Sequence, residues 1–286
     1  MIQFLYLGRV PYDEALRVQE EVSALRLTGR IPNTLLLLEH PPVLTLGRNA
    51  DRSNVLASDA LLAARGVTLH HINRGGDVTY HGPGQLVGYP IFNLRSLMRP
   101  ASDPSQERKR LGPVDFVRMM EEALIRLCGV YGVQAGRIAG LTGVWCAAYG
   151  RLSYEGSGTE ANGRKIAAIG IHVARGIVTH GFALNVTTNL SDFQLINPCG
   201  ITDKPVTSLH LEVADPAAIP PLESVANQAA RQFGLVFEQQ ILAVASLDAL
   251  RAQAAEALPS QAEDTPLTVP FEIQRIHDEM NPLVRS

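Results

Sequence analysis

The chain has few cysteines, modest charge and no long apolar run. Its 286 residues contain three cysteines, Cys128, Cys146 and Cys199, too few for a disulfide framework and typical of a reducing compartment. Charged residues make up 19% and the formal net charge is -3, which argues against a general nucleic-acid binder. The leucine run at 35–38 has the length of a strand, whereas a membrane span needs roughly 20 apolar residues.

Sorting, metal-binding and nucleotide-binding signals are also missing. The N-terminal sequence MIQFLYLGRVPYDEA has neither a basic region nor a small-residue cleavage site, so we expect a cytoplasmic protein without a signal peptide. The histidine pair at 70–71 is not accompanied by a CxxC or HExxH pattern, so we expect no metal site. The main glycine-rich stretch contains neither GK[ST] nor a helix-opening GxGxxG, so it lacks the usual nucleotide-binding signatures.

Hydrophobic residues make up 46% of the chain, which is enough for a sizeable core. Apolar residues at helical spacing predict helices at 13–26 and 113–131, and most of 222–257 reads as helical. Short apolar runs predict strands, among them 165–173 and 181–186. Because strands and helices are mixed without βαβ regularity, the sequence favours an α+β fold.

The stretch 74–90, RGGDVTYHGPGQLVGYP, follows a predicted strand and is rich in glycine. Glycine admits positive φ and lets backbone N–H groups approach a ligand closely. A plain hairpin turn is the alternative, but such a turn needs only two to five residues or so and leaves the second turn beside His81 unexplained. The stretch therefore predicts a substrate groove lined by backbone.

The three cysteines differ in their surroundings. Cys128 lies in a helical pattern and Cys146 in a strand-like run, so both are predicted to be small core residues. Cys199 lies in the loop LINPCGITD, where a free amide follows it, and is a candidate nucleophile. A buried loop thiol is the alternative, and no protease signature surrounds Cys199.

A thiol becomes a thiolate beside a base or a cation. The predicted strand 165–173 turns and returns as 181–186, so the end of the second strand lies beside the start of the first. Lys165 and the loop to Cys199 then meet at that end, and small residues after Lys165 partly desolvate its stem. A solvated surface lysine is the alternative. The candidate partners of the thiol are Lys165, His81, His172 and His180.

The stretch 74–90 resembles the signature of the lipoyl(octanoyl) transferases, the octanoyl-carrier-protein:protein N-octanoyltransferases. Four further segments resemble the same family in the same order: LLLLEHPPVLTLGR, KIAAIGIHVARGIVTHGFALNV, DFQLINPCGI and VTSL. Together they span roughly residues 30–210. The resemblance implies a fold like the catalytic domain of biotin and lipoate protein ligases, with a mixed β-sheet and helices packed on it.

The resemblance also implies an activity and a set of roles. Cys199 would form an acyl thioester, and Lys165 would lower the pKa of the thiol and move protons. The octanoyl group would pass from octanoyl-acyl carrier protein to the lysine of lipoyl domains, the first step of endogenous protein lipoylation, with no cofactor, nucleic acid or membrane involved. The acceptors would be lipoyl domains of 2-oxoacid dehydrogenase subunits and the glycine cleavage H protein. The implied substrate-binding residues are Arg74, Gly75, Gly76, Asp77, Val78, Thr79, Tyr80, His81, Ala168, Ile169, Gly170, Gly181, Phe182 and Ala183.

We expect the octanoyltransferase domain at 1–245, with a ligase-like core at about 30–240. The C-terminal extension at 246–286 is predicted to be helical first and then a loosely attached tail. Two loops, 99–112 and 147–163, are longer than the family pattern.

Three alternatives stay open. An ATP-dependent ligase of the same fold would activate a free acid and would not need Cys199. A non-catalytic module would bind the carrier protein without transferring its acyl group. The basic run at 108–110 is either a solvated loop or a docking site for an acidic protein.

Overall fold

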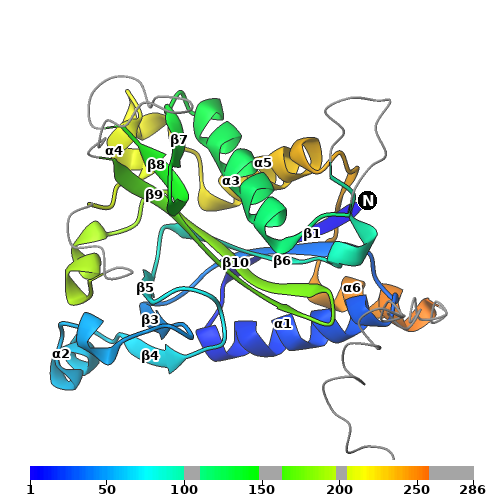
Figure 1. Ribbon diagram of the computed structural model, residues 1–286, viewed down its shortest axis with the longest axis horizontal. Helices are drawn as coiled ribbons and strands as arrows, with labels where there is room; N and C mark the ends of the chain where they lie inside the picture. The colour runs from blue at the N-terminus through cyan, green and yellow to red at the C-terminus, as the bar shows by residue number, and fades with distance from the viewer. Residues whose placement is uncertain (100–109, 148–162, 198–204, 258–286) are drawn as a thin grey trace, which may run out of the picture.

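One large mixed sheet organises the computed structural model, which describes residues 1–99, 110–147, 163–197 and 205–257 (Figure 1). In these residues the strand order is β11-β1-β2-β6-β10-β9-β8-β7. The pairs β11·β1 and β1·β2 are parallel and the others are antiparallel. The strands are β1 (Ile2–Arg9), β2 (Asn33–Glu39), β6 (Gln85–Ile91), β7 (Ala135–Ile138), β8 (Leu141–Cys146), β9 (Arg164–Ala174), β10 (Ile177–Asn185) and β11 (Ile241–Ala243).

A smaller sheet lies beside the large one, in the order β4-β3-β5. Its strands are β3 (Val43–Leu46), β4 (Thr68–His71) and β5 (Val78–His81). The small sheet has an apolar cluster of its own, which includes Leu44, Val78 and Phe193. β5 forms inside the glycine-rich stretch, so this stretch contributes a strand as well as turns.

Helices cover both faces of the large sheet (Figure 1). The helix α1 (Tyr12–Leu27) packs on one face through Val18 and Val22, and the neighbouring helices α3 (Pro113–Val130) and α5 (Leu222–Val236) pack on the other. The shorter helices are α2 (Asp59–Ala64), α4 (Leu209–Glu212) and α6 (Leu247–Glu256). The 3₁₀ turns are η1 (Arg52–Asn54), η2 (Leu94–Ser96), η3 (Leu190–Leu195) and η5 (Pro216–Ala218). The predicted α+β fold with a mixed sheet and packed helices is confirmed.

The segment 222–257 is less uniformly helical than its composition suggests, because β11 separates α5 from α6. The helix α6 follows residue 245, and its Leu250 and Ala254 are buried in the cluster beneath α1. Gln253 of α6 also accepts a hydrogen bond of 2.7 Å from Gln3 of β1. The predicted tail at 258–286 lies outside the described residues.

A proline interrupts the ladder between β6 and β10. The pairing register on either side of the interruption puts Pro90 opposite His180, and proline has no N–H to donate. His180 adopts a φ of 55°, and its N–H donates to Gln19 Oε1 of α1 at 2.8 Å. Its ring Nε2 lies 2.7 Å from Asn73 Oδ1. Where the ladder lacks a hydrogen bond, His180 therefore connects the sheet to α1 and to the loop after β4.

A second buried imidazole, His40, connects the end of β2 to its neighbours. Its Nδ1 lies 2.7 Å from the carbonyl oxygen of Val10, which can only accept, so Nδ1 carries the proton and Nε2 accepts from the Tyr89 hydroxyl at 2.7 Å. Burial lowers the pKa of His40 to about 4. Burial, with the charge of Arg74 beside it, also lowers the pKa of His180 to about 4.

Acidification should weaken the fold before carboxyl groups titrate. The unfolded imidazoles bind protons near pH 6.5, whereas His40 and His180 in the fold bind them only near pH 4. The unfolded state therefore binds more protons in this window, so the stability contribution is complete above pH 6.5 and is lost as the pH falls. We expect the free energy of unfolding to fall by about 1–2 kcal/mol per ring between pH 7 and pH 5. Urea unfolding at several pH values measures this, and His40→Gln should reduce the slope; an unchanged stability at pH 5 would contradict the assignment.

Helix α6 should contribute measurably to stability. Leu250 has 0% exposure, so Leu250→Ala leaves a cavity beneath α1 and should lower the free energy of unfolding by about 2–5 kcal/mol. The matched control is Leu242→Ala in β11, where the leucine is 46% exposed and the change should stay within about 0.5 kcal/mol. Equal effects of the two substitutions in urea unfolding would show that α6 is not part of the cooperative core.

Candidate functional site

A cavity of about 370 Å³ lies where the glycine-rich stretch meets β9 and β10. Glycines and apolar side chains make up most of its wall. The structure brings twelve of the predicted site residues to this cavity: Arg74, Gly75, Gly76, Thr79, His81, Lys165, Ala168, Ile169, Gly170, Gly181, Phe182 and Ala183.

Three of the predicted lining residues have other positions. Side chains alternate along a strand, so in β5 the side chains of Val78 and Tyr80 point into the small-sheet cluster while those of Thr79 and His81 line the cavity. The Tyr80 hydroxyl donates to Asp192 Oδ2 at 2.9 Å. The Asp77 carboxylate accepts from the N–H of Val78 at 2.7 Å and so orders its own turn. The residues predicted to line the groove, 74–81, therefore do not all do so: some line the cavity, and others face the small-sheet cluster or order the turn.

Glycine is required where two stretches of backbone approach each other in the cavity wall. The N–H of Gly75 donates to the carbonyl of Ile171 at 3.0 Å, and a Cβ on Gly170 would lie 2.8 Å from the Gly75 oxygen. A Cβ on Gly181 would lie 2.2 Å from the carbonyl oxygen of Gly88. Both distances are shorter than a real Cβ contact, so this close approach of backbone to backbone needs residues without side chains.

Lys165 lies near the start of β9, at one side of the cavity. Its Nζ is 4.7 Å from the centroid of the Trp145 ring, a distance suited to a cation–π contact. The pair Leu184 and Ala167 belongs to the β9–β10 register, so the predicted hairpin, with the end of β10 beside the start of β9, is confirmed.

The backbone of Lys165 also borders the described segment that begins at Pro205, six residues after Cys199 in the sequence. Its N–H donates to the Pro205 carbonyl at 2.8 Å, and its carbonyl accepts from Thr207 at 2.9 Å. Two residues before Cys199 in the sequence, the N–H of Asn197 donates to the Asn54 carbonyl at 2.7 Å. Cys199 itself lies outside the described residues. Cys128 and Cys146 are buried, as predicted, and burial raises the pKa of the Cys146 thiol to about 12.

A chain of side-chain amides fixes the tautomer of His81. Gln85 donates through Nε2 to Tyr80 O at 3.2 Å and to Asn185 Oδ1 at 2.9 Å, and Asn185 donates in turn to Thr207 O at 2.9 Å. Gln85 Oε1 therefore accepts from His81 Nδ1 at 2.8 Å, so Nδ1 carries the proton and Nε2 is an acceptor. Burial lowers the pKa of His81 to about 3, so the ring is neutral at physiological pH.

The cavity wall also includes residues that are not among the predicted site residues, such as Tyr12, Tyr89, Val117 and Leu141. Tyr12 is the first residue of α1, and burial raises its pKa. Tyr89 belongs to β6, whose residues are all buried. The polar and apolar pattern of this strand therefore does not indicate which side chains face the cavity. Of the other candidate histidines, His180 lines this cavity and His172 lines a second one of about 810 Å³ beside α1.

The described residues contain no group of three or more His, Cys, Asp or Glu side chains arranged to hold a metal ion. Among those same residues, no helix has the length and apolar composition needed to cross a membrane.

Comparison with known proteins gives the family. The lipoyl protein ligase A/B catalytic domain matches residues 11–234. An octanoyltransferase of Acidobacterium capsulatum is 58% identical over 242 residues, which cover 85% of this chain and 92% of the relative. An octanoyltransferase of Koribacter versatilis is 46% identical over 279 residues, or 98% of each protein.

Solved structures share the fold at low sequence identity. A lipoate-protein ligase A bound with ATP has a TM-score of 0.62 at 16% identity, covering 90% of this chain and 94% of that one. A bipartite lipoate protein ligase from Thermoplasma acidophilum has a TM-score of 0.60 at 16% identity, covering 90% and 91%. These likenesses confirm the predicted ligase-like fold. The family model and the sequence relatives show that the chain belongs to the octanoyltransferases of the lipoyl protein ligase A/B catalytic-domain family.

Proposed function

We propose that this chain transfers an octanoyl group from octanoyl-acyl carrier protein to the lysine of a lipoyl domain, through a thioester on Cys199. The acceptors are the lipoyl domains of 2-oxoacid dehydrogenase subunits and the glycine cleavage H protein. Both donor and acceptor are carried on proteins and the donor is already a thioester, so the reaction needs no ATP.

One observation carries the proposal: a single cavity joins Lys165 to the glycine-rich stretch and to the β9–β10 hairpin. An extended acyl chain offers only its carbonyl for hydrogen bonding, so backbone and small apolar residues suit it better than polar side chains. Each methylene buried in such a groove contributes about 0.8 kcal/mol. The neutral His81 and the apolar wall formed by Val117, Ile169 and Phe182 keep the groove suitable for an uncharged ligand.

The first half-reaction forms the acyl-enzyme. The Cys199 thiolate attacks the thioester carbonyl, and backbone N–H groups stabilise the tetrahedral oxyanion. The carbon–sulfur bond to the pantetheine thiol breaks as Lys165 gives that thiol a proton. Octanoyl-Cys199 and free carrier protein result.

The second half-reaction forms the amide. The neutral amine of the acceptor lysine attacks octanoyl-Cys199, and Lys165 accepts the proton that the nitrogen loses. The thioester bond then breaks, which returns the Cys199 thiolate. His81 presents a lone pair at Nε2, so it can orient a water or an N–H group but cannot donate to the oxyanion.

The covalent step can be tested by intact-protein mass after incubation with octanoyl-acyl carrier protein, without ATP and without acceptor. Wild type should gain one octanoyl group, Cys199→Ala none, and Lys165→Ala should acquire it about 100-fold more slowly or worse. Cys128→Ala, which removes a buried thiol, should behave as wild type.

Two results would contradict the mechanism. Near-normal transfer by Cys199→Ala would exclude the thioester on that residue. Activity that appears only with free octanoate and ATP would favour the ligase chemistry of the structural neighbour bound with ATP.

The groove assignment can be tested at Gly170. A methyl group at this position would lie 2.8 Å from Gly75 O and 3.3 Å from Arg74 Cδ, so Gly170→Ala should displace the loop that walls the groove. We expect octanoyl transfer to fall by about 10- to 100-fold. Gly129→Ala is the matched control, because a Cβ at this exposed position of α3 meets nothing within 4 Å. Full activity of Gly170→Ala would show that the acyl chain lies elsewhere.

A further inference from the structure

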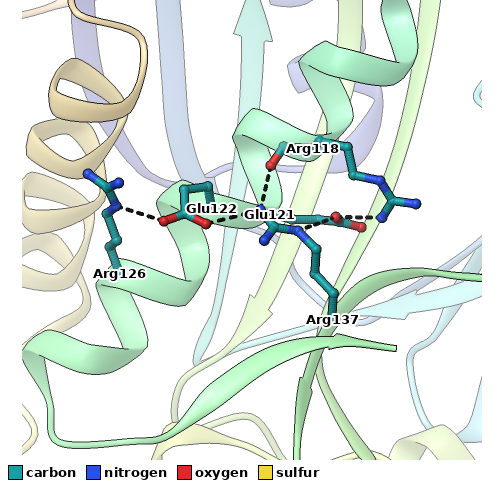
Figure 2. Close-up of polar contacts among 5 residues, drawn as sticks. All are labelled: Arg118, Glu121, Glu122, Arg126 and Arg137. Carbon is teal, nitrogen blue, oxygen red and sulfur yellow. Dashed lines mark hydrogen bonds and ion pairs between the residues drawn. The ribbon is translucent and has the colours of Figure 1, made fainter. Parts of the chain in front are cut away.

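Glu121 is a carboxylate buried in the middle of α3. Its side chain has 0% exposure. Its Oε2 pairs with Arg118 Nη1 at 2.7 Å and with Arg137 Nε at 3.0 Å (Figure 2). The other oxygen, Oε1, accepts the backbone N–H of Gly143 in β8 at 3.0 Å. A buried charge is retained only with such partners, because desolvation costs several kcal/mol.

The contact at Gly143 lies directly against the Lys165 side chain. Gly143 has a φ of +124°, a conformation that favours glycine. A Cβ there would lie 2.7 Å from the Ala167 oxygen and 3.4 Å from Lys165 Cε. The backbone that Glu121 holds is therefore the surface on which the lysine stem rests.

The β7–β8 hairpin, to which Gly143 belongs, forms part of the cavity wall. Gly140, Leu141 and Thr142, just before Gly143, line the cavity together with Lys165. Arg137 lies on β7, the other strand of the hairpin, and also donates through Nη2 to the Arg118 carbonyl at 2.9 Å. The cluster therefore fastens both strands of the β7–β8 hairpin to α3.

We infer that Glu121 is a positioning residue for Lys165: it fixes β8 at Gly143, so that the lysine stem keeps the position from which it serves Cys199. This inference rests on the proposed pairing of Lys165 with Cys199. Glu121 is not among the residues that line the cavity, and its effect would pass through the backbone of Gly143.

The neighbouring residue provides a matched control. Glu122 belongs to the same cluster and pairs with Arg126 Nε at 2.9 Å and Arg137 Nη2 at 3.1 Å (Figure 2). Among the described residues, the hydrogen bonds of its carboxylate go to Arg126 and Arg137 and not to Gly143. A loss of charge at 122 therefore perturbs the cluster without releasing the backbone beside Lys165.

The test uses the pH dependence of thiol alkylation at Cys199, followed by mass mapping of the modified peptide in the full-length protein. Lys165→Ala defines the profile expected when the lysine is absent. Glu121→Gln should shift the profile upward in pH toward that of Lys165→Ala and slow acyl-enzyme formation by about 10- to 100-fold. Glu122→Gln should match wild type in both measurements.

A second variant covers the case in which Glu121→Gln does not fold. Glu121→Asp keeps the charge for both arginines but is one methylene too short to hold Gly143 as well, so it should shift the profile in the same direction. A folded Glu121→Gln or Glu121→Asp with the wild-type profile would overturn the inference while leaving the Lys165–Cys199 pair intact. A wild-type profile in Lys165→Ala would instead overturn the proposed pair, and the role of Glu121 with it.

Discussion

The cavity depends on the packing of one arginine among backbone that carries no side chains. Arg74 is 8% exposed, and its guanidinium donates to Thr45 of β3 and to its own loop at Gly75 O, at 2.8 and 3.0 Å. A Cβ on Gly47 would lie 2.9 Å from Nη1, and one on Gly170 would lie 3.3 Å from Cδ. Glycine at these positions leaves room for the Arg74 side chain, which connects the small sheet to β9. The groove lies where these two sheets meet.

The buried arginine also sets the electrostatics of the groove. Its charge acts with burial to lower the pKa of His81 and of His180, so both rings stay neutral at physiological pH. The proposed acyl chain would therefore meet neutral imidazole rings and a guanidinium that is held in place by its own hydrogen bonds. The architecture therefore explains both the shape of the groove and its suitability for an uncharged ligand.

Local patterns were sufficient to predict the elements that are long and periodic. The helix α3 and the β9–β10 hairpin follow from apolar spacing, and the hairpin geometry predicts where Lys165 lies relative to the end of β10. The short strands β5, β7 and β11 were not predicted, because three or four residues are too few to show a periodic apolar pattern. The strand β5 is also flanked by glycine and proline. Its alternation, which turns Val78 and Tyr80 away from the groove, was hidden for the same reason.

Contacts between distant segments could not be predicted in this way. Glu121 reads as a polar residue on an ordinary helix, and nothing near it in sequence indicates that its carboxylate holds Gly143. Tyr12 likewise reaches the cavity only because α1 begins where β1 leaves the sheet. Such residues become recognisable when burial and partners are known, because a buried carboxylate or phenol needs a reason for its position.

The burial that shapes the groove also explains why a lysine would serve the thiol better than a histidine. Every imidazole described on the cavity wall has a strongly lowered pKa, about 3 for His81 and about 4 for His180, and neither is a cation at neutral pH. A thiol beside a neutral ring gains no electrostatic stabilisation of its thiolate. The ordinary pKa of a lysine lies roughly four units above that of a histidine. Burial can therefore lower the pKa of a lysine in part while the amine still keeps its proton at neutral pH. The face of Trp145 gives the ammonium of Lys165 an apolar but attractive surface, which suits the proton-transfer role proposed for it.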